Sequence, residues 1–373
     1  MKKIRTAIIG PGKVAHLHAK NLATSEKSEF VAVCGRTLLR TEVFAREYSV
    51  EAYDDLEKMI RQEQVEVLLV CTPHPYHREP VVKAVELGVA CLIEKPMAST
   101  LEDCDAMLEA ALKNNVTLGV ISQRRFYEPV QRMKKAIDQG KIGTPMLGHV
   151  IMLGWRDEAY YQSDPWRGKW ETEGGGVLVN QAPHQLDLFQ WLMGEIDQVY
   201  AVTRNLNHPY IEVEDTAVAV VQFKSGAVGN ILLSNSQKPG IYGKIHIHGK
   251  NGASVGAQTE GGAMFIAGQS AVLEAPVNDI WTVPSEESMV DEWKKADQDF
   301  FNEINAAEYY IGLQIDDFLE AFNKGRLPLV DGIEGRKTVE LFTAIYRSNR
   351  NQSPVQFPLA PEFGTDLDGR IGS

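Results

Sequence analysis

The chain has 373 residues, a formal net charge of −12 at pH 7, 44% hydrophobic residues and 24% charged residues. Its length exceeds the size at which a single core usually stops growing, so we expect two domains of ordinary globular composition. The negative charge argues against a nucleic-acid or anionic-membrane surface, because both require clustered positive charge. No segment approaches the roughly 20 apolar residues of a membrane span.

Cysteine usage and the N-terminus bear on the compartment. The cysteines form no CxxC pair, which predicts buried free thiols in a reducing environment. The apolar stretch after the N-terminal lysines is too short for a signal peptide. We therefore expect a cytoplasmic protein with four free thiols: Cys34, Cys71, Cys91 and Cys104.

Up to Arg124, short apolar runs alternate with amphipathic stretches. Continuous apolar strands separated by helices predict a parallel sheet covered on both faces. The expected strands are 4–9, 30–34, 67–71, 90–93 and 117–121, and the expected helices are 16–24, 40–48, 79–87 and 101–113.

The pattern changes after Arg124, where strands follow one another and alternate with a period of two, as in an antiparallel sheet. We expect strands at 213–223, 227–233 and 244–249, and helices at 130–138, 184–193, 311–324 and 333–347. The pattern therefore predicts an α/β domain followed by an α+β domain with a mainly antiparallel sheet. The predicted domains are 1–124 and 125–353, followed by an extended C-terminal arm at 354–373.

A glycine-rich turn joins the first predicted strand to the first helix. Glycines in a G-x-G-x-x-A pattern allow a tight turn and the close approach of a pyrophosphate to the backbone, and the helix N-terminus faces the phosphates. The pattern is specific here because it follows a strand and opens a βαβ alternation. It predicts a dinucleotide site formed by Gly10, Pro11, Gly12, Lys13 and Val14.

The second predicted strand does not end in the acidic residue that usually holds the ribose 2′-hydroxyl of NAD. It ends in Gly35, Arg36 and Thr37. Gly35 leaves room, while Arg36 and Thr37 offer donors to a 2′-phosphate. This favours NADP slightly over NAD, the alternative being a solvated arginine in an NAD enzyme.

Two further loops follow predicted parallel strands at the edge where such folds bind ligands. In Cys71-Thr72-Pro73-His74-Pro75-Tyr76-His77 we expect cofactor contacts from Cys71, Thr72, Pro73, His74 and His77. A metal site there is not favoured, because no further ligand has metal-type spacing, and the pair His246 and His248 is typical of surface pairing. In Glu94-Lys95-Pro96 we expect cofactor contacts from Glu94 and Lys95, and Lys95 would also meet a hydroxyl near the nicotinamide. The alternative is a surface lysine.

Aromatic and basic side chains gather in two stretches, 123–126 and 154–170. Aromatic faces pack on sugar C–H groups and arginines bind hydroxyls. Aromatic clusters are equally often core, but the interleaved cations are costly to bury unpaired. We expect cofactor contacts from Gln123, Trp166 and Arg167, and substrate contacts from Arg124, Arg156, Tyr160, Tyr161 and Trp166.

The stretch 174–184 places three glycines before Asn180, Gln181 and His184, where a helix begins. The whole chain resembles the glucose-fructose oxidoreductase / inositol dehydrogenase / rhizopine-catabolism (Gfo/Idh/MocA) family. The resemblance rests on Gly10-Pro11-Gly12, Thr72-Pro73 with His77, Glu94-Lys95-Pro96, Gly174-Gly175-Gly176 through His184 and Asp187, and Asp331-Gly332.

This resemblance implies an α/β Rossmann domain for NAD(P) binding at 1–124. It implies that 125–353 is an α+β domain for substrate binding and oligomerisation, with a large, mainly antiparallel open sheet. The activity it implies is NAD(P)-dependent hydride transfer at a hydroxyl of a sugar, glycoside or cyclitol. It also implies a homodimer or homotetramer formed through the second domain's sheet. By position, Lys95 matches the family's lysine beside the reacting hydroxyl, and His184 matches the catalytic histidine. Asn180 stands where many members have aspartate, so an amide replaces an ionisable group.

Within this reading, His184 is the expected base, because the helix dipole disfavours a cation in the first turn. Lys95 would stabilise the developing alkoxide. The alternative is a lysine base oriented by the histidine. Asn180 and Gln181 suit substrate hydroxyls. Two other functions stay open: a redox-neutral, NAD-dependent glycoside-cleaving enzyme that oxidises its substrate transiently, and a non-enzymatic NAD(P)-binding regulator.

Overall fold

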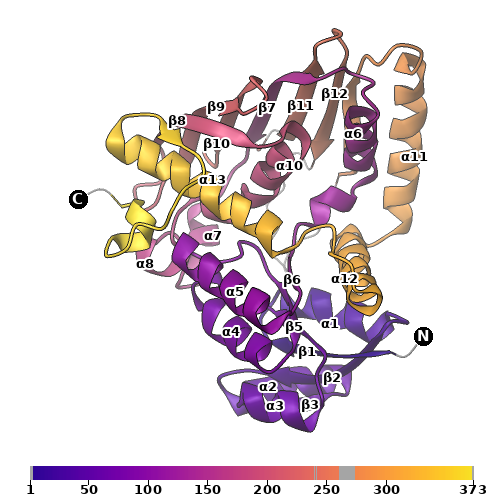
Figure 1. Cartoon of the computed structure of the whole chain (residues 1–373), viewed down its shortest axis with the longest axis vertical. Coiled ribbons are helices and arrows are strands. Elements are labelled where there is room, and N and C mark those ends of the chain that lie inside the picture. Colours follow the sequence, from indigo (N-terminus) through magenta and orange to yellow (C-terminus); the bar gives the residue numbers. More distant parts are fainter. Residues whose placement is uncertain (1–2, 239, 241, 260–273, 372–373) are drawn as a thin grey trace. The chain divides into compact units, whose positions relative to one another are not determined.

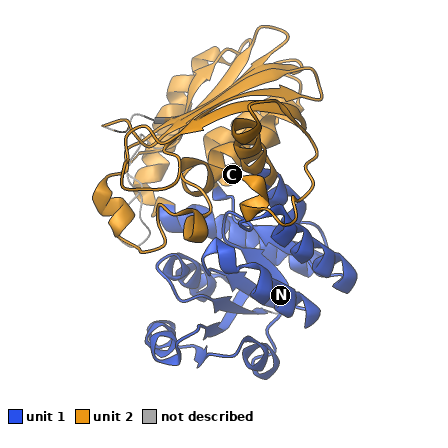
Figure 2. Cartoon of the chain, turned by 90° about the vertical axis from the view of Figure 1, so that its left-hand side faces the viewer, with its two compact units in different colours: residues 1–123, 266–271, 307–339 blue, residues 124–265, 272–306, 340–373 orange. Residues whose placement is uncertain are grey.

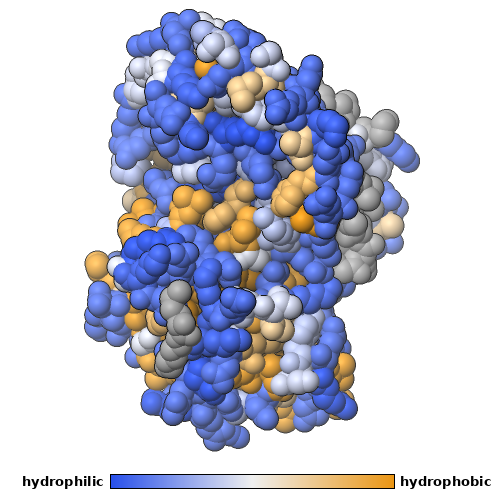
Figure 3. All heavy atoms as spheres, turned by 90° about the vertical axis from the view of Figure 1, so that its right-hand side faces the viewer, coloured by the Kyte–Doolittle hydropathy of each residue, from blue (hydrophilic) through white to orange (hydrophobic). Residues whose placement is uncertain are grey.

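The computed structural model describes residues 3–238, 240, 242–259 and 274–371, and the chain falls into two compact units (Figures 1 and 2). The described residues of unit 1 lie within 1–123 and 307–339, and those of unit 2 lie within 124–265, 272–306 and 340–373. None of the helices in these ranges has the length and apolar character that crossing a membrane would need. Hydrophilic side chains cover much of the face drawn in Figure 3.

Unit 1 is built on a six-stranded sheet of order β3-β2-β1-β4-β5-β6, in which every neighbouring pair is parallel. Its buried strands β4 and β5 are continuous apolar runs, as a sheet covered on both faces requires. The strands are β1 (Ile4–Ile9), β2 (Ser28–Cys34), β3 (Glu51–Tyr53), β4 (Val67–Val70), β5 (Ala90–Ile93) and β6 (Leu118–Val120). The helices are α1 (Ala15–Thr24), α2 (Leu38–Tyr48), α3 (Leu56–Gln62), η1 (His74–Tyr76), α4 (Arg78–Glu86) and α5 (Leu101–Asn114).

Unit 1 also takes in a segment from far along the chain. Helix α12 (Ala306–Lys324) packs on the sheet, where the Phe318 ring lies so close to Gly119 that a Cβ on that glycine would stand 2.7 Å from it. The Gln314 amide accepts from the Ser122 N–H at 2.8 Å and donates to the Val120 carbonyl at 2.8 Å. We predicted that 307–339 would belong to the second domain, so the compact units divide the chain differently there.

Unit 2 is built on an eight-stranded sheet of order β13-β12-β11-β7-β10-β9-β8-β14. It is mostly antiparallel, as predicted, but β7 and β10 pair in parallel. The strands are β7 (Pro145–Leu153), β8 (Ile196–Arg204), β9 (Thr216–Phe223), β10 (Val228–Ser234), β11 (Tyr242–Gly249), β12 (Ser254–Thr259), β13 (Val277–Trp281) and β14 (Val355–Gln356). Together the two sheets confirm the predicted fold class.

Helices cover one face of the unit 2 sheet, with α6 and α10 in front of it in Figure 1. The strands alternate accordingly: in β9, Ala217, Ala219 and Val221 are buried while Val218 and Val220 are exposed. Apart from α12, the helices from Gln123 onward are η2 (Gln123–Phe126), α6 (Glu128–Asp138), α7 (Glu158–Gln162), α8 (Trp170–Glu173), α9 (Val177–Asn180), α10 (Pro183–Met193), η3 (Glu287–Met289), α11 (Val290–Glu303), α13 (Gly332–Asn351) and η4 (Asp366–Gly369).

Part of the predicted C-terminal arm packs within unit 2. Arg370 is only 3% exposed, and its guanidinium donates to the Thr343 hydroxyl at 3.0 Å and to the Gly174 carbonyl at 3.1 Å. The central carbon of this guanidinium also lies 4.5 Å from the centre of the Phe342 ring. The end of the chain therefore supports the start of the glycine stretch.

Candidate functional site

The turn between β1 and α1 has the shape that a pyrophosphate needs. Gly10 adopts φ +92°, and a Cβ there would lie 2.7 Å from the Thr72 backbone nitrogen, so only glycine fits. A Cβ on Gly12 would meet no heavy atom within 4 Å, so its exposed backbone can be approached from outside. The ten-residue helix α1 begins at Ala15 and points its N-terminus at this turn. The glycine turn therefore fits a dinucleotide.

The end of β2 carries the residues that we expect to face the adenosine ribose. Arg36 and Thr37 are exposed, and the Arg36 guanidinium lies 6.0 Å from the centre of the Tyr76 ring. Gly35 is buried, and a Cβ there would stand 2.8 Å from the Pro11 ring. This packing brings the second-strand loop against the glycine turn.

His77 contacts the backbone of two of the predicted cofactor loops with its buried side chain. Its side chain is fully buried, and its ring nitrogens lie 3.0 Å from the Met97 carbonyl and 2.7 Å from the Thr72 carbonyl. Burial lowers the pKa of His77, although both carbonyls favour the charged form. The imidazole thus ties the Thr72-Pro73 loop to the loop that follows Lys95. Direct contact of His77, His74 or Cys71 with a cofactor stays a prediction.

Behind Lys95 lies a buried histidine–carboxylate contact that sequence reasoning missed. His18 on α1 is 1% exposed, and its Nε2 lies 2.6 Å from Glu94 Oε1. The other oxygen of Glu94 accepts from the Lys95 backbone N–H at 3.0 Å. Burial acts to raise the pKa of Glu94, but the His18 contact and the charge of Lys95 outweigh it, so the pKa lies below its ordinary value. This contact links the Lys95 loop to the helix after the glycine turn.

In unit 2, His184 occupies the first turn of α10, one residue after Pro183, and is 8% exposed. The helix is anchored one turn later by Asp187, whose carboxylate accepts from the Arg125 guanidinium at 2.7 and 2.9 Å. Both members of this pair are buried, and Arg125 also lies 5.0 Å from the centre of the Trp191 ring. The start of α10 is therefore held firmly.

Close packing requires glycine at two of the three positions, 175 and 176. Gly175 adopts φ +152°, and a Cβ on it would stand 2.3 Å from the Tyr346 hydroxyl. A Cβ on Gly176 would stand 1.8 Å from the Glu214 carbonyl oxygen. The Glu214 carboxylate accepts from the N–H groups of Gly176 and Leu178, each at 3.0 Å, which caps helix α9. The stretch before Asn180 is thus clamped from several sides.

A polar network surrounds the Tyr160 hydroxyl, which accepts from the Arg167 guanidinium at 2.5 Å and from the Gln181 amide at 2.8 Å. Arg167 also stacks on the rings of Tyr160 and Trp166, at 4.3 and 4.4 Å from their centres. Asn180 donates to the Tyr160 hydroxyl at 3.3 Å and, more closely, to the Glu173 carboxylate. Five residues that we expected to bind substrate or cofactor therefore meet here, together with the unexpected Glu173.

The other predicted site residues of unit 2 make contacts of their own. The Arg156 guanidinium lies 5.4 Å from the Tyr160 ring centre, and the Tyr161 ring meets that of Tyr160 edge-on at 5.1 Å. Arg124 donates to the Thr259 hydroxyl at 3.0 Å. Lys95, Gln123 and the glycine turn belong to unit 1, whereas Arg124 and His184 belong to unit 2.

The strand histidines lie together on the sheet. The His246 ring centre is 4.7 Å from that of His149, and His246 Nε2 is 2.8 Å from an oxygen of Asp279. His248 Nδ1 lies 2.7 Å from the Ser254 hydroxyl. Within the described ranges, no group of three or more His, Cys, Asp or Glu side chains is placed to hold a metal ion.

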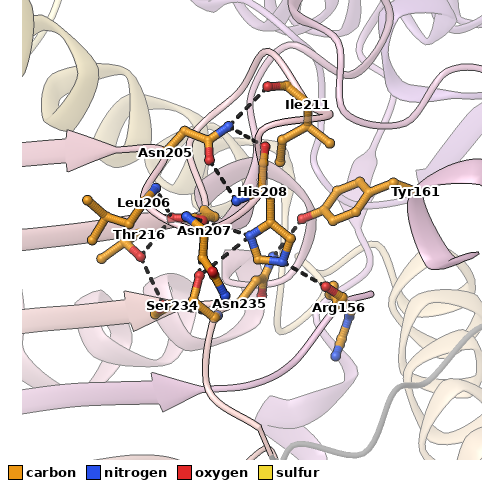
Figure 4. A network of polar contacts seen from close by, with 12 residues as sticks. Arg156, Tyr161, Asn205, Leu206, Asn207, His208, Ile211, Thr216, Ser234 and Asn235 are labelled. Carbon is orange, nitrogen blue, oxygen red and sulfur yellow. Dashed lines mark hydrogen bonds and ion pairs between the residues drawn. The ribbon is translucent and has the colours of Figure 1, made fainter. Parts of the chain in front are cut away.

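A second buried network, drawn in Figure 4, was not foreseen from the sequence. The fully buried His208 contacts Asp215 at 2.7 Å and the Arg156 carbonyl at 2.8 Å. Asn235, also in this network, donates to the Gln181 side-chain oxygen at 3.0 Å. Burial acts to raise the pKa of Asp215, but the contact with His208 and nearby backbone N–H groups hold it well below its ordinary value. The network therefore holds the backbone at Arg156 through His208, and it orients the Gln181 side chain through Asn235.

Sequence signals for these supports were weak. Glu214 and Asp215 form an acidic pair directly before a strand, and Glu173 stands directly before the glycines. Acidic residues at such positions are usually solvated, and only the three-dimensional packing shows that these three are buried.

Comparison with known proteins gives the family. Residues 4–122 match the NAD-binding Rossmann fold of the oxidoreductase family Gfo/Idh/MocA, and residues 134–357 match its C-terminal alpha/beta domain. The chain is 27% identical to scyllo-inositol 2-dehydrogenase (NAD(+)) of Bacillus subtilis (strain 168), over 95% of this chain and 96% of the relative. It is 31% identical to 2,7-anhydro-N-acetylneuraminate hydratase of Mediterraneibacter gnavus, over 54% of this chain and 53% of the relative.

Among solved structures, the WlbA dehydrogenase from Bordetella pertussis, in complex with NADH and UDP-GlcNAcA, is similar with a TM-score of 0.80. The two proteins are 28% identical, and the match covers 96% of this chain and 100% of that one. Two family models that together span most of the sequence, and a matching fold, agree with the glycine turn and the two sheets described above. The chain therefore belongs to the Gfo/Idh/MocA family of oxidoreductases, with an NAD-binding Rossmann domain.

Proposed function

We propose that this protein transfers a hydride between NAD(P) and a ring hydroxyl or ketone of a sugar, glycoside or cyclitol. One observation carries the proposal. The hydrogen-bonded polar network, here called the polar wall, contains Asn180, Gln181, Tyr160 and Arg167, and its two amides directly precede the start of α10, which bears His184. Amides and a guanidinium suit the many hydroxyls of such substrates. The relatives named as an inositol dehydrogenase and as a dehydrogenase bound to a nucleotide sugar support the same class.

The cofactor would be held by the glycine turn, by Arg36 and Thr37 at the ribose, and by the loops that carry Thr72 and Lys95. When bound, the nicotinamide supplies the hydride acceptor or donor. The chain's own residues must then orient the alcohol and move its proton.

His184 is the proposed base. Its position in the first turn of α10, after Pro183, places it where the helix dipole disfavours an imidazolium, so the ring stays able to accept a proton. Lys95 would donate a hydrogen bond to the same oxygen and stabilise its developing charge. If Lys95 were the base and His184 its orienting partner, loss of the lysine would cost more than loss of the histidine.

A spectrophotometric screen tests the proposal, with sugars, glycosides and cyclitols offered together with NAD or NADP and absorbance of the reduced cofactor as the readout. Lys95→Ala and His184→Ala should each lower turnover by roughly two or more orders of magnitude while leaving cofactor affinity unchanged. Lys113→Ala, which removes an exposed lysine on α5, is the matched control. Unchanged rates in both variants would sink the assignment.

A redox-neutral reaction is the second candidate, favoured by the similarity to a hydratase that acts on 2,7-anhydro-N-acetylneuraminate. In that case the hydride leaves the substrate and returns to it, so no reduced cofactor accumulates. Chromatographic detection of a cleaved or hydrated product, without any net absorbance change, would favour this candidate over the first. Cofactor binding with neither signal would indicate a regulator.

For the cofactor itself, we propose a modest preference for NADP. The end of β2 offers the exposed Arg36 and Thr37 and no adjacent carboxylate. Arg36→Ala should weaken NADP binding about tenfold, with little change for NAD, because a charged hydrogen bond to the 2′-phosphate is lost. Equal loss for the two cofactors would show that Arg36 does not face the phosphate.

We further propose a homodimer or homotetramer formed through the uncovered face of the unit 2 sheet. This face carries apolar side chains exposed by 37% to 54%: Tyr200, Val202, Val218, Val220 and Val228. Val220→Asp should lower the mass measured by light scattering if the face is buried between copies.

The four buried free cysteines suit a reducing cytoplasm, where we expect the protein to work.

A further inference from the structure

We propose that Glu173 is a positioning residue that fixes which end of the Asn180 amide is offered to the substrate. Glu173 is the last residue of α8 and only 1% exposed, so its carboxylate lies inside unit 2. One of its oxygens accepts from the Gly168 N–H at 2.5 Å, and the other accepts from the Asn180 amide nitrogen. The inference rests on the proposed function, because it assigns a role within the same polar wall.

The polarity of Asn180 follows from the partners of its NH₂ group. An ionised carboxylate only accepts hydrogen bonds, so it holds the Asn180 nitrogen on its own side. The Tyr160 hydroxyl, which accepts from Arg167 and Gln181, is the second acceptor for that nitrogen. The Asn180 carbonyl oxygen is then directed to the opposite side of the amide, where it can accept from a substrate hydroxyl.

Protonation of Glu173 would remove this preference. A protonated carboxyl can donate, so it pairs equally well with the Asn180 oxygen, and the amide can turn over. The groups that act on Glu173 are the Arg167 guanidinium, which favours the ionised form, the Glu214 carboxylate, which opposes it, and the phenols of Tyr160 and Tyr161. Burial raises the pKa of Glu173 to about 7, so the amide orientation becomes pH-dependent near neutrality.

The geometry predicts that the carboxylate and the amide can exchange places. Glu173→Gln leaves two amides in contact and removes the enforced orientation. Asn180→Asp puts two carboxylates in contact, of which one must take up a proton. In the double variant the two roles are reversed: the new amide at position 173 donates to the new carboxylate at position 180, and the pair again carries one charge.

The experiment measures kcat/KM, kcat and cofactor affinity from about pH 6 to about pH 9 in wild type, both single variants and the double variant. At about pH 8 each single variant should lose roughly ten- to a hundredfold in kcat/KM, as expected for a lost hydrogen bond to a charged group, with unchanged cofactor affinity. The double variant should regain roughly tenfold or more over either single one, and Glu173→Gln should lack the acid limb near pH 7. Glu171→Gln, an exposed carboxylate on the same helix, is the matched control and should match wild type.

A Glu173→Gln variant within about twofold of wild type, or a double variant no better than the single ones, would overturn the inference. If wild type itself shows no reaction with any substrate, the proposed function fails, and the inference is judged by the thermal unfolding midpoint instead. The midpoint of the double variant should then lie nearer to wild type than that of Asn180→Asp. A double variant less stable than both single ones would overturn the inference on this readout.

Discussion

Replacing Glu214 by glutamine should change how the free energy of unfolding depends on pH. Glu214 is 4% exposed, and its carboxylate accepts hydrogen bonds from the backbone N–H groups of Gly176 and Leu178, each at 3.0 Å. Burial raises its pKa to about 7, although these hydrogen bonds oppose the rise. Because the pKa is higher in the folded state, its stabilising contribution is full below the unfolded value of 4.5 and is lost as the pH rises through about 7.

The size of this effect follows from the two pKa values. At about 1.4 kcal/mol per pKa unit, the difference between 4.5 and about 7 corresponds to about 3 kcal/mol. Glutamine resembles the protonated side chain and does not titrate. The free energy of unfolding of Glu214→Gln, relative to wild type, should therefore rise by up to about 3 kcal/mol between about pH 5 and about pH 8.

Urea denaturation followed by tryptophan fluorescence, at several pH values in that range, measures this difference. Hydrogen exchange at the Leu178 amide reports on the capped helix α9 directly. Glu109→Gln, which replaces an exposed carboxylate on α5, should run parallel to wild type. If Glu214→Gln also runs parallel to wild type, burial does not perturb this carboxylate and the reasoning is wrong.

Three more predictions concern packing and charge. Gly12→Ala should fold normally, because the added Cβ meets nothing within 4 Å, yet should weaken cofactor binding in a fluorescence titration. Gly176→Ala should lower the free energy of unfolding by about 2 kcal/mol or more, since its Cβ would stand 1.8 Å from a carbonyl oxygen; an unchanged denaturation midpoint would contradict this. Arg125→Ala should cost about 3 to 5 kcal/mol by taking the guanidinium away from the buried Asp187 carboxylate, measurable by urea denaturation.

Much of unit 1 could be predicted because its signals are local. Strands β1 and β5 have the predicted bounds, since short, largely apolar runs that alternate with helices are typical of the strands of a covered parallel sheet. The short β3 and helix α3 were missed, because β3 has three partly exposed residues and no apolar run. The sequence also does not show that α12 joins this unit, because packing between distant segments leaves no local pattern.

In unit 2 the alternating strands β9 and β10 were predicted, but their neighbours β7 and β8 were not. The parallel pairing of β7 with β10 depends on the sheet order, which periodicity does not encode. Asn180, Gln181 and His184 could be proposed as site residues from the sequence because a glycine stretch and a helix start mark them. Their supports Glu173 and Asp215 resemble solvated acids in the sequence.

The sequence by itself therefore determined the dinucleotide turn, the two-domain class, the family and the residues at the start of α10, because each depends on neighbours along the chain. The tertiary structure decided which acids are buried. It also decided that Arg370, near the end of the chain, donates to the Gly174 carbonyl, and that the Asn180 amide donates to Glu173 and Tyr160. The physical reason is that burial and hydrogen bonding between distant residues depend on how elements pack, and packing places side chains of ordinary appearance in perturbed environments.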